Sequence, residues 1–315
     1  MTTERLLIEG ATILNSAWLA QDPPPGGRNF LQEARHESRL LLSWATAWPL
    51  SSLLAHPERV VETRMQTLFL DGIRRRADSE PIAYITGFAG FFGREFEVGP
   101  AVLIPRPETE LLVETVLSWC TGGDLATGCL PRRETQSDRD LPLRVLDVGT
   151  GSGCIPITLL CACPEMVAIA VDVSPDALAV ARRNAFRHKV DNRLELVRMD
   201  VLSETPDRIQ DKVDVLLSNP PYISTGSLAS LMPDVIRHEP VLALDGGVDG
   251  LVFYRRILRL AEHWLRPGGL LAVEIGYDQG EAVCELFRQA DFAPCCLQDM
   301  EKRDRVVVGV IDKKQ

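Results

Sequence analysis

The chain has 315 residues, of which 45% are hydrophobic and 25% charged, and its formal net charge at pH 7 is −10. This length suits an α/β domain with a smaller partner domain, and the composition is typical of a soluble globular protein. The acidic balance argues against nucleic acid as the main ligand, because phosphate binding usually needs a basic face.

Residues 1–80 are predicted to form a small helical bundle. Leu6, Ala11, Leu14 and Trp18 recur with a helical period, and similar spacings follow in residues 31–44 and 60–73. A Pro/Gly run at 23–27 and single prolines at 49 and 57 break the pattern between these stretches. We therefore expect several short helices in a first domain.

Residues 81–105 carry four glycines among aromatic and β-branched residues. This mixture predicts a β-hairpin that links two domains. From residue 106 to 315, short apolar runs alternate with helical stretches, which is typical of βαβ units and a largely parallel sheet. The polar stretch 121–142 interrupts this pattern and is expected to be an insertion before the first strand of the sheet.

The first strand of that sheet runs into a glycine-rich turn that is expected to hold a cofactor. The turn consists of Gly149, Thr150, Gly151, Ser152 and Gly153. Glycines let the backbone approach a ligand closely, but this pattern alone fits a dinucleotide as well as S-adenosylmethionine.

Acids at the ends of the next two strands extend the predicted cofactor site. Asp172 follows the glycines by about twenty residues, where a carboxylate accepts from the ribose hydroxyls of an adenosine-containing ligand. Ser174 is a better N-cap than Asp172 for the following helix, which leaves Asp172 for the ligand. Asp200 and the backbone of Val201 are the candidates for binding adenine.

The fourth strand ends in Asn219-Pro220-Pro221-Tyr222, the predicted catalytic motif. The Asn219 side-chain oxygen and the Pro220 carbonyl can hold the two hydrogens of a planar NH2 group, while Pro221 stiffens the turn and Tyr222 stacks on the flat group. This is catalysis by positioning. The motif argues against a dehydrogenase, but it leaves glutamine amide, adenine N6 and cytosine N4 open as targets.

With these motifs in place, the chain resembles the release-factor glutamine methyltransferase family over nearly its whole length. The resemblance is carried by segments 81–87, 91–93, 96–98, 102–110, 147–153, 219–222 and 239–250. It implies a Rossmann-like, seven-stranded methyltransferase domain at 106–315, after an N-terminal helical domain that recognises the release factor and a hairpin linker. It also implies S-adenosylmethionine as the methyl donor, S-adenosylhomocysteine as the product, and the Gly-Gly-Gln glutamine N5 of class I release factors as the target.

Arg106 and Glu108 lie in the most distinctive of these segments, Ile-Pro-Arg-Pro-Glu-Thr-Glu at 104–110. They are candidates for substrate binding, and the alternative is a charge pair at the start of a solvated helix. A DNA or RNA amino-methyltransferase, or a glutamine methyltransferase of another translation protein, remains an alternative function. DNA enzymes share the 219–222 motif but not the 104–110 segment.

The cellular setting is predicted from what the sequence lacks. No apolar run reaches the ~20 residues of a membrane helix, and the N-terminus has no signal-peptide pattern. We expect a cytoplasmic monomer. The cysteine spacing predicts no metal site.

Overall fold

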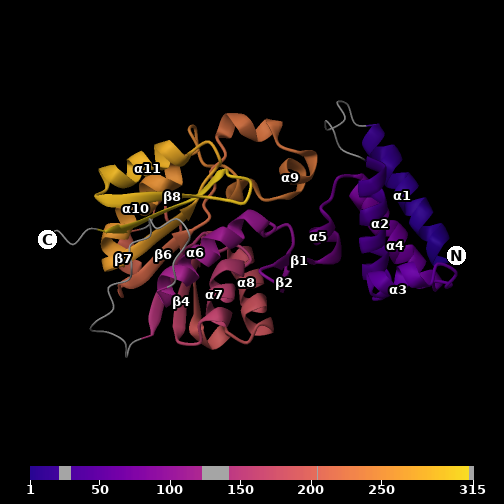
Figure 1. Ribbon diagram of the computed structural model, residues 1–315, viewed down its shortest axis with the longest axis horizontal. Coiled ribbons are helices and arrows are strands. Elements are labelled where there is room, and N and C mark those ends of the chain that lie inside the picture. Colours follow the sequence, from indigo (N-terminus) through magenta and orange to yellow (C-terminus); the bar gives the residue numbers. More distant parts are fainter. Residues whose placement is uncertain (21–29, 123–141, 204, 312–315) are drawn as a thin grey trace. The chain divides into compact units, whose positions relative to one another are not determined.

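The computed structural model describes residues 1–20, 30–122, 142–203 and 205–311 (Figure 1). The chain divides into two compact units. The first comprises Met1–Phe88 and Met232–His238, and the second comprises Ala89–Leu231 and Glu239–Gln315. Of the predicted insertion at 121–142, residues 123–141 lie outside the described residues. In the described part of the chain, no helix is long and apolar enough to cross a membrane.

The first unit is helical, as the sequence predicts. Its helices are α1 (Thr3–Leu19), α2 (Phe30–Thr46), α3 (Leu50–Ala55), α4 (Thr63–Ala77), α5 (Ile82–Thr86) and α9 (Pro233–His238). Helices α1, α2 and α4 pack on one another around fully buried Leu6, Leu14, Leu41 and Phe69. Gly10 lets α1 approach closely, because a β-carbon there would lie 2.6 Å from the Phe69 ring.

Paired charges lie inside this helical unit. Arg76 Nε of α4 donates a 2.7 Å hydrogen bond to Glu37 Oε2 of α2, and both side chains are largely buried. Burial raises the pKa of Glu37, and the hydrogen bond from Arg76 opposes that shift. The neighbouring Arg75 donates to Glu80 at 2.8 Å. Two of the three consecutive arginines at 74–76 are therefore neutralised within the unit.

Helix α9 groups with the helical unit although the sequence analysis assigns residues 106–315 to one domain. Its Asp234 and His238 lie close enough to Glu37 and Glu80 to interact electrostatically. Spatial contacts rather than chain order therefore decide the unit to which α9 belongs. The predicted domain boundaries after residues 80 and 105 stay predictions.

The predicted hairpin is shorter than the range 81–105. Its strands are β1 (Phe88–Phe91) and β2 (Arg94–Glu97), which form a two-stranded sheet. Helix α5 precedes them and is bracketed by Pro81 at its N-cap and Gly87, with φ 83°, at its C-cap. Proline favours the start of a helix, and a glycine in the left-handed conformation favours its end. The two residues therefore produce one short helix where extended structure was predicted.

The second unit contains a seven-stranded sheet of the order β5-β4-β3-β6-β7-β9-β8, which confirms the predicted Rossmann-like fold. The strands are β3 (Leu143–Val148), β4 (Met166–Asp172), β5 (Leu194–Arg198), β6 (Val213–Ser218), β7 (Leu265–Glu274), β8 (Phe292–Gln298) and β9 (Asp304–Ile311). Strands β3 to β7 pair in parallel, and β9 runs antiparallel to both β7 and β8.

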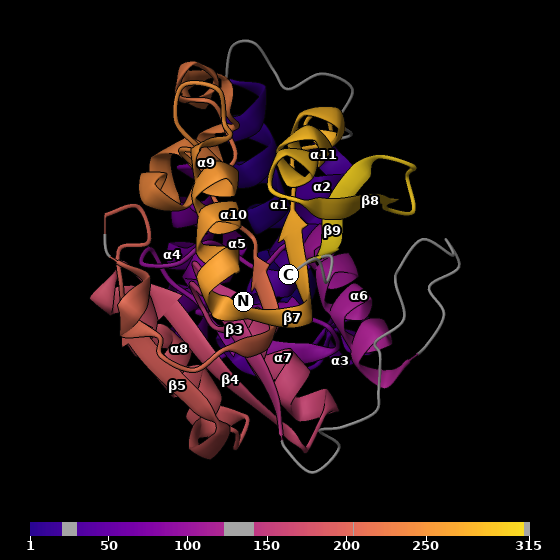
Figure 2. The same ribbon diagram turned by 90° about the vertical axis from the view of Figure 1, so that its left-hand side faces the viewer.

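Helices cover both faces of this sheet (Figure 2). They are α6 (Glu110–Thr121), α7 (Cys154–Ala162), α8 (Pro175–Arg187), α10 (Val252–Trp264) and α11 (Gly280–Gln289). Short 3-10 turns lie at Pro107–Thr109, Asp191–Arg193, Pro206–Arg208, Thr225–Ser230 and Val241–Ala243. One core packs α6 and α7 against the sheet, and a second packs α10 and α11 against the other face. The carboxyl ends of β3 to β7 consequently meet at one edge.

Candidate active site

The predicted motifs converge at the carboxyl edge of the sheet. Gly149 directly follows β3, Asp172 ends β4, and Asn219 directly follows β6. The hydroxyl of Ser218 donates a 2.6 Å hydrogen bond to the Val148 carbonyl, which ties the ends of β6 and β3 together. The glycine-rich turn and the Asn-Pro-Pro-Tyr motif are therefore neighbours in space.

The glycine-rich turn adopts backbone conformations that favour glycine. Gly149, Gly151 and Gly153 have φ values of 77°, 55° and 78°, which L side chains rarely adopt. A β-carbon at Gly153 would lie 2.9 Å from the Ile157 side chain, so this end of the turn packs on α7. Among the described residues, no atom outside the local chain lies within 4 Å of a β-carbon built at Gly151. The turn therefore leaves open space for a ligand at its middle.

Asp172 is hydrogen-bonded to this turn. Its Oδ2 accepts from the Gly151 backbone N–H at 2.9 Å, and its Oδ1 accepts from the Ser174 N–H at 2.9 Å. Burial raises the pKa of the carboxyl group, and these backbone donors oppose that shift. Ser174 Oγ accepts from the Ala177 N–H at 3.1 Å, which confirms Ser174 as the N-cap of α8. Each oxygen of Asp172 keeps a lone pair for a further donor.

Asp200 closes the turn after β5. Its Oδ1 accepts from the Leu202 N–H at 3.0 Å, and its Oδ2 accepts from the Ser203 hydroxyl at 2.7 Å. The carboxylate also borders a pocket of about 240 Å³. Val201 is buried, and its carbonyl accepts from Arg256 Nε at 2.6 Å. Both predicted adenine-binding positions thus lie at the same sheet edge as Asp172, and their role stays a prediction.

The Asn-Pro-Pro-Tyr motif packs tightly against the loop at 243–250. The Ile223 N–H donates to the Leu244 carbonyl at 3.0 Å, and the Gly246 N–H donates to the Ile223 carbonyl at 2.8 Å. A β-carbon at Gly246 would lie 2.8 Å from the Pro221 carbonyl oxygen. The loop at 243–250, which contains Asp245-Gly246-Gly247, therefore supports the backbone of the motif. Burial raises the pKa of Tyr222 to about 12, so its hydroxyl stays neutral.

Gln279, which the sequence analysis does not single out, joins three parts of this site. Its Nε2 donates to the Tyr222 carbonyl at 3.0 Å and to the Gly250 carbonyl at 3.3 Å. Its Oε1 accepts from the Gly276 N–H at 3.0 Å and from the Tyr254 hydroxyl at 3.3 Å. Gln279 follows the apolar run of β7 without any recognisable motif, so no sequence signal indicates it.

Asn219 also has a partner that the sequence analysis does not name. Its Nδ2 donates a 3.1 Å hydrogen bond to the hydroxyl of Thr109, which is buried. Thr109 also neighbours Glu274 at the end of β7, and burial raises the pKa of that carboxyl group to about 7. Thr109 lies within the distinctive 104–110 segment. Its position in that segment was the only indication in the sequence that Thr109 could belong to the site.

Arg106 and Glu108 differ in their surroundings. Arg106 forms an ion pair with Glu239, whose side chain is buried, so the 104–110 segment is joined to the Glu239-Pro240 motif. Glu108 is exposed in the 3-10 turn that precedes α6. The Arg106 guanidinium thus has a structural partner, and substrate binding by either residue stays a prediction.

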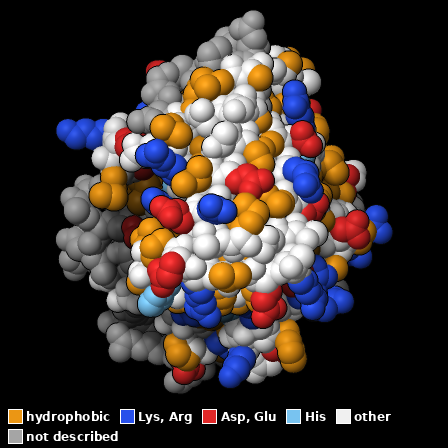
Figure 3. Space-filling model, turned by 90° about the vertical axis from the view of Figure 1, so that its right-hand side faces the viewer, with side chains coloured by type: hydrophobic (Ala, Val, Ile, Leu, Met, Phe, Trp, Pro, Cys, Tyr) orange, Lys and Arg blue, Asp and Glu red, His pale blue; other side chains and the backbone are white. Residues whose placement is uncertain are grey.

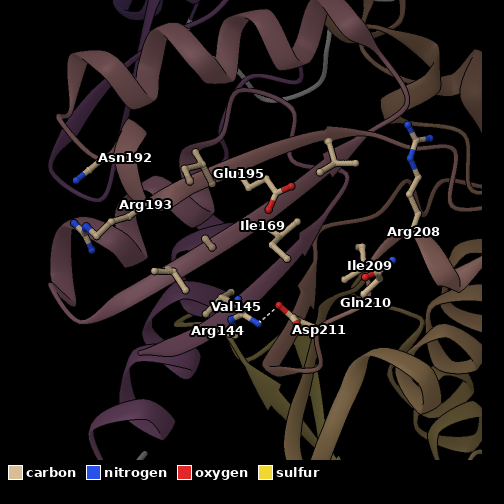
Figure 4. A pocket seen from close by; sticks show the side chains of 14 residues that line it. Arg144, Val145, Ile169, Asn192, Arg193, Glu195, Arg208, Ile209, Gln210 and Asp211 are labelled. Atoms are coloured by element: carbon tan, nitrogen blue, oxygen red, sulfur yellow. Dashed lines mark ion pairs between the residues drawn. The ribbon is translucent and has the colours of Figure 1, made fainter. Parts of the chain in front are cut away.

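A larger groove lies at the other edge of the sheet. It has a volume of about 500 Å³ and is lined by residues 144–145 of β3, 167–169 of β4, 192–195 and 197 at β5, and 208–211. Arg144 and Asp211 form an ion pair in it (Figure 4). None of the predicted site residues lines this groove, so its size does not make it the catalytic site.

Comparisons with known proteins agree with this architecture. A family model described as "Methyltransferase small domain" matches residues 124–240, and one described as "PrmC N-terminal domain" matches residues 27–87. The release factor glutamine methyltransferase of Cereibacter sphaeroides is 41% identical over 88% of this chain and 91% of that protein. The one from Caulobacter vibrioides is 38% identical over 87% of this chain and 88% of that protein.

Two further matches are a longer relative and a solved structure. The bifunctional methyltransferase of Rickettsia typhi is 35% identical over 86% of this chain, but the chain spans only 52% of that relative, about half its length. The solved release factor-specific protein-(glutamine-N5) methyltransferase of Alicyclobacillus acidocaldarius is 30% identical over 69% of this chain and 99% of that chain, with a TM-score of 0.39.

The parallel sheet, the glycine-rich turn and the Asn-Pro-Pro-Tyr motif at one sheet edge are typical of the Rossmann-like methyltransferase fold, and a methyltransferase family model matches residues 124–240. The relatives at 38% and 41% identity are matched over almost their entire length. The chain therefore belongs to the release factor glutamine methyltransferase family.

Proposed function

We propose that this protein transfers a methyl group from S-adenosylmethionine to the side-chain amide N5 of the glutamine in the Gly-Gly-Gln motif of class I release factors. The observation that carries the proposal is the placement of Asn219 directly after β6, beside the glycine-rich turn and hydrogen-bonded to Thr109 of the 104–110 segment. This joins the general amino-methylating motif to the segment that distinguishes the family from DNA enzymes.

The residues at the carboxyl edge fit the proposed cofactor. Gly151 leaves open space in the turn, and the Asp172 carboxylate beside it keeps lone pairs for ribose hydroxyls. Asp200 at the end of the neighbouring strand borders a pocket and is the candidate for the adenine amino group. S-adenosylmethionine would supply an electrophilic methyl group here and leave as S-adenosylhomocysteine.

The chemistry proposed for Asn219 and Pro220 is positioning. An amide NH2 is a poor nucleophile, because its lone pair is delocalised. Two acceptors, the Asn219 side-chain oxygen and the Pro220 carbonyl, would hold its hydrogens and aim the nitrogen at the methyl carbon. With S-adenosylmethionine bound, its sulfonium sulfur would be the leaving group as the amide nitrogen takes the methyl carbon, and the amide proton would then pass to solvent water, so no strong base is needed before transfer.

Nucleic acid is the weaker alternative. It would require a basic channel around the site, whereas the net charge is −10 and Arg75 and Arg76 are paired with Glu80 and Glu37. The face drawn in Figure 3 has basic and acidic side chains interspersed with hydrophobic ones rather than a continuous basic patch. These observations favour a protein substrate recognised with the help of the helical unit.

A methyl-transfer assay tests the proposal. The purified chain would be incubated with S-adenosylmethionine labelled in the methyl group and with a class I release factor, its Gly-Gly-Ala variant, another glutamine-containing translation protein, or duplex DNA. We expect label on the wild-type release factor alone, at the glutamine. Label on DNA would support the nucleic acid alternative, and equal labelling of the Gly-Gly-Ala variant would place the methyl elsewhere.

A further inference from the structure

The side-chain amide of Asn184 on α8 connects the glycine-rich turn to the β1–β2 hairpin. Its Nδ2 donates a 2.9 Å hydrogen bond to the carbonyl of Ser152 in the turn, and another of 2.9 Å to the carbonyl of Glu97 at the end of β2. Its Oδ1 accepts from the Glu97 N–H at 2.7 Å. Asn184 is fully buried, so these three bonds form away from water.

The backbone partners determine the orientation of this amide. A backbone N–H only donates and a backbone carbonyl only accepts. The Asn184 oxygen must therefore face the Glu97 N–H, and the two hydrogens of its Nδ2 serve the two carbonyls. Rotation of the amide by 180° would set a donor against a donor, so only one orientation satisfies all three partners. Asn184 is thus a fixed connection between β2 and the turn.

The turn is held at two successive residues. Asp172 accepts from the N–H of Gly151 at 2.9 Å, and Asn184 donates to the carbonyl of the next residue, Ser152. The hydrogen-bond ladder of α7 begins at the Gly153 carbonyl, so the helix does not supply a donor to Ser152. A buried carbonyl without a donor is costly. The bond from Asn184 therefore stabilises one conformation of the peptide that follows Gly151, where the turn leaves open space.

We propose that Asn184 is a positioning residue that holds the glycine-rich turn in the conformation that receives S-adenosylmethionine. This inference rests on the proposed function, since it concerns the cofactor site of the same methyl transfer. A turn that is fixed before binding loses little conformational freedom when the ligand enters, and this strengthens binding. Asn184 acts through the Ser152 backbone and does not touch the reacting atoms.

Asn184→Leu tests this role, because leucine has a similar size but no hydrogen-bonding group. The dissociation constant for S-adenosylhomocysteine, measured by calorimetry, should rise about 10-fold, since one hydrogen bond changes an equilibrium by about that factor. The KM for S-adenosylmethionine should rise with it, while kcat at saturating cofactor stays close to the wild-type value. Asn184→Asp is a second variant that keeps the oxygen facing the Glu97 N–H but loses the donor to Ser152, and it should shift the constant in the same direction. An unchanged constant in both variants would overturn the inference.

Two control variants separate this effect from a general loss of packing. Arg183 precedes Asn184 on α8 and donates to the Glu97 carboxylate at 2.6 Å, so Arg183→Ala weakens the same hairpin contact but leaves the bond to the turn. Thr115→Val removes a buried hydroxyl that bonds the Leu111 carbonyl within α6. Both controls should bind S-adenosylhomocysteine like the wild type. An equal rise of the dissociation constant in either control would overturn the inference.

Amide hydrogen exchange of the ligand-free protein supplies a readout that needs no methyl acceptor. The N–H groups of Gly151 and Gly153 bond to Asp172 and to the Thr150 carbonyl. Their exchange should be faster in Asn184→Leu and unchanged in the Thr115→Val control. Unchanged exchange in Asn184→Leu would overturn the inference even if the dissociation constant rises, because the effect would then not act through the turn.

The wild-type protein separates this inference from the proposed function. A wild type that binds S-adenosylhomocysteine but labels no release factor would refute the proposed substrate, and the positioning role would still be decided by binding and exchange. A wild type that binds no S-adenosylhomocysteine would overturn the inference itself, because the turn would then not be a cofactor site.

Discussion

The side-chain nitrogen of Gln279 donates a 3.0 Å hydrogen bond to the carbonyl oxygen of Tyr222, the last residue of the Asn-Pro-Pro-Tyr motif. The two residues are 57 positions apart in the chain, and Gln279 also bonds the Gly250 carbonyl. The side-chain amide of Gln279 thus fixes the backbone that follows Asn219 and Pro220.

Gln279→Leu should therefore damage catalysis more than folding. The substitution leaves the carbonyls of Tyr222 and Gly250 without this donor, which typically costs about 1–3 kcal/mol of unfolding free energy. Displacement of the motif should lower kcat by about 10-fold or more. Gln289→Leu at the other end of α11 is the control, since Gln289 is exposed and its side chain bonds the exposed Glu285. Steady-state kinetics and urea unfolding would measure both effects, and a wild-type kcat in Gln279→Leu would refute the supporting role.

Gly250→Ala should disturb the same support by a steric route. Gly250 has φ +71°, and a β-carbon there would lie 2.4 Å from the Tyr222 carbonyl oxygen. The backbone conformation costs an L residue about 1–2 kcal/mol, and the clash requires Tyr222 to move. We expect loss of most methyl transfer with the circular dichroism spectrum retained. Gly226→Ala should leave activity unchanged, because a β-carbon at Gly226 meets no atom of the described residues within 4 Å. Equal activity of the two variants would contradict the tight packing at Gly250.

Asn219→Ala should nearly abolish turnover, because it removes one of the two acceptors proposed for the substrate NH2. Loss of one such preorganised group typically lowers kcat by about 100-fold or more. The dissociation constant for S-adenosylmethionine should stay close to the wild-type value when measured by calorimetry. A variant that keeps most of its rate would show that the assigned acceptor role is wrong.

Asp172→Ala should weaken cofactor binding. The carboxylate is the proposed partner of the ribose hydroxyls, and loss of hydrogen bonds to a charged group costs about 1.5–3 kcal/mol, or roughly 10- to 100-fold in the dissociation constant. Asp176→Ala is the control, because Asp176 lies nearby in the first turn of α8 and is exposed. Calorimetric titration with S-adenosylhomocysteine would measure both variants. An unchanged constant in Asp172→Ala would remove the ribose assignment.

Asp147→Asn should change how stability depends on pH. Asp147 is fully buried, and burial raises the pKa of its carboxyl group from 3.8 to about 7. Between these values the native state binds a proton that the unfolded chain has released, so the free energy of unfolding falls as pH rises towards 7. The fall is on the order of 4 kcal/mol at most, and stability is flat above that pH.

The asparagine variant lacks this titration. Urea unfolding at pH 5 and pH 8 should show that Asp147→Asn gains stability relative to the wild type as pH rises. The exposed Asp191 offers a control, since Asp191→Asn should follow the wild-type profile at both pH values. A constant difference between Asp147→Asn and the wild type would indicate that Asp147 is ionised in the native protein even at pH 5.

The location of the site at the sheet edge could be predicted from the sequence because it depends on local patterns. Apolar runs ending in Asp172, or followed directly by Gly149 and Asn219, predict strands, and the carboxyl ends of parallel strands meet at one edge. Ser174 as a helix cap was predictable for the same reason, since the signal lies within four residues. The short helix α5 was not predicted, because its aromatic and β-branched residues favour a strand. The capping residues Pro81 and Gly87, which indicate a helix, were given less weight.

The supports of the site were decided by the tertiary structure. Thr109 lies 110 positions from Asn219, and Gln279 lies 57 positions from Tyr222, so no periodicity or turn signal joins either pair. Helix α9 likewise groups with helices nearly 200 residues earlier in the chain because of its contacts. Strand and turn propensities depend on residues that are neighbours in the sequence. A buried hydrogen bond instead joins polar groups that packing brings together away from water, and these groups can be far apart in the chain. The sequence by itself therefore determined which sheet edge carries the candidate site, and the packing of the sheet decided which side chains support its backbone.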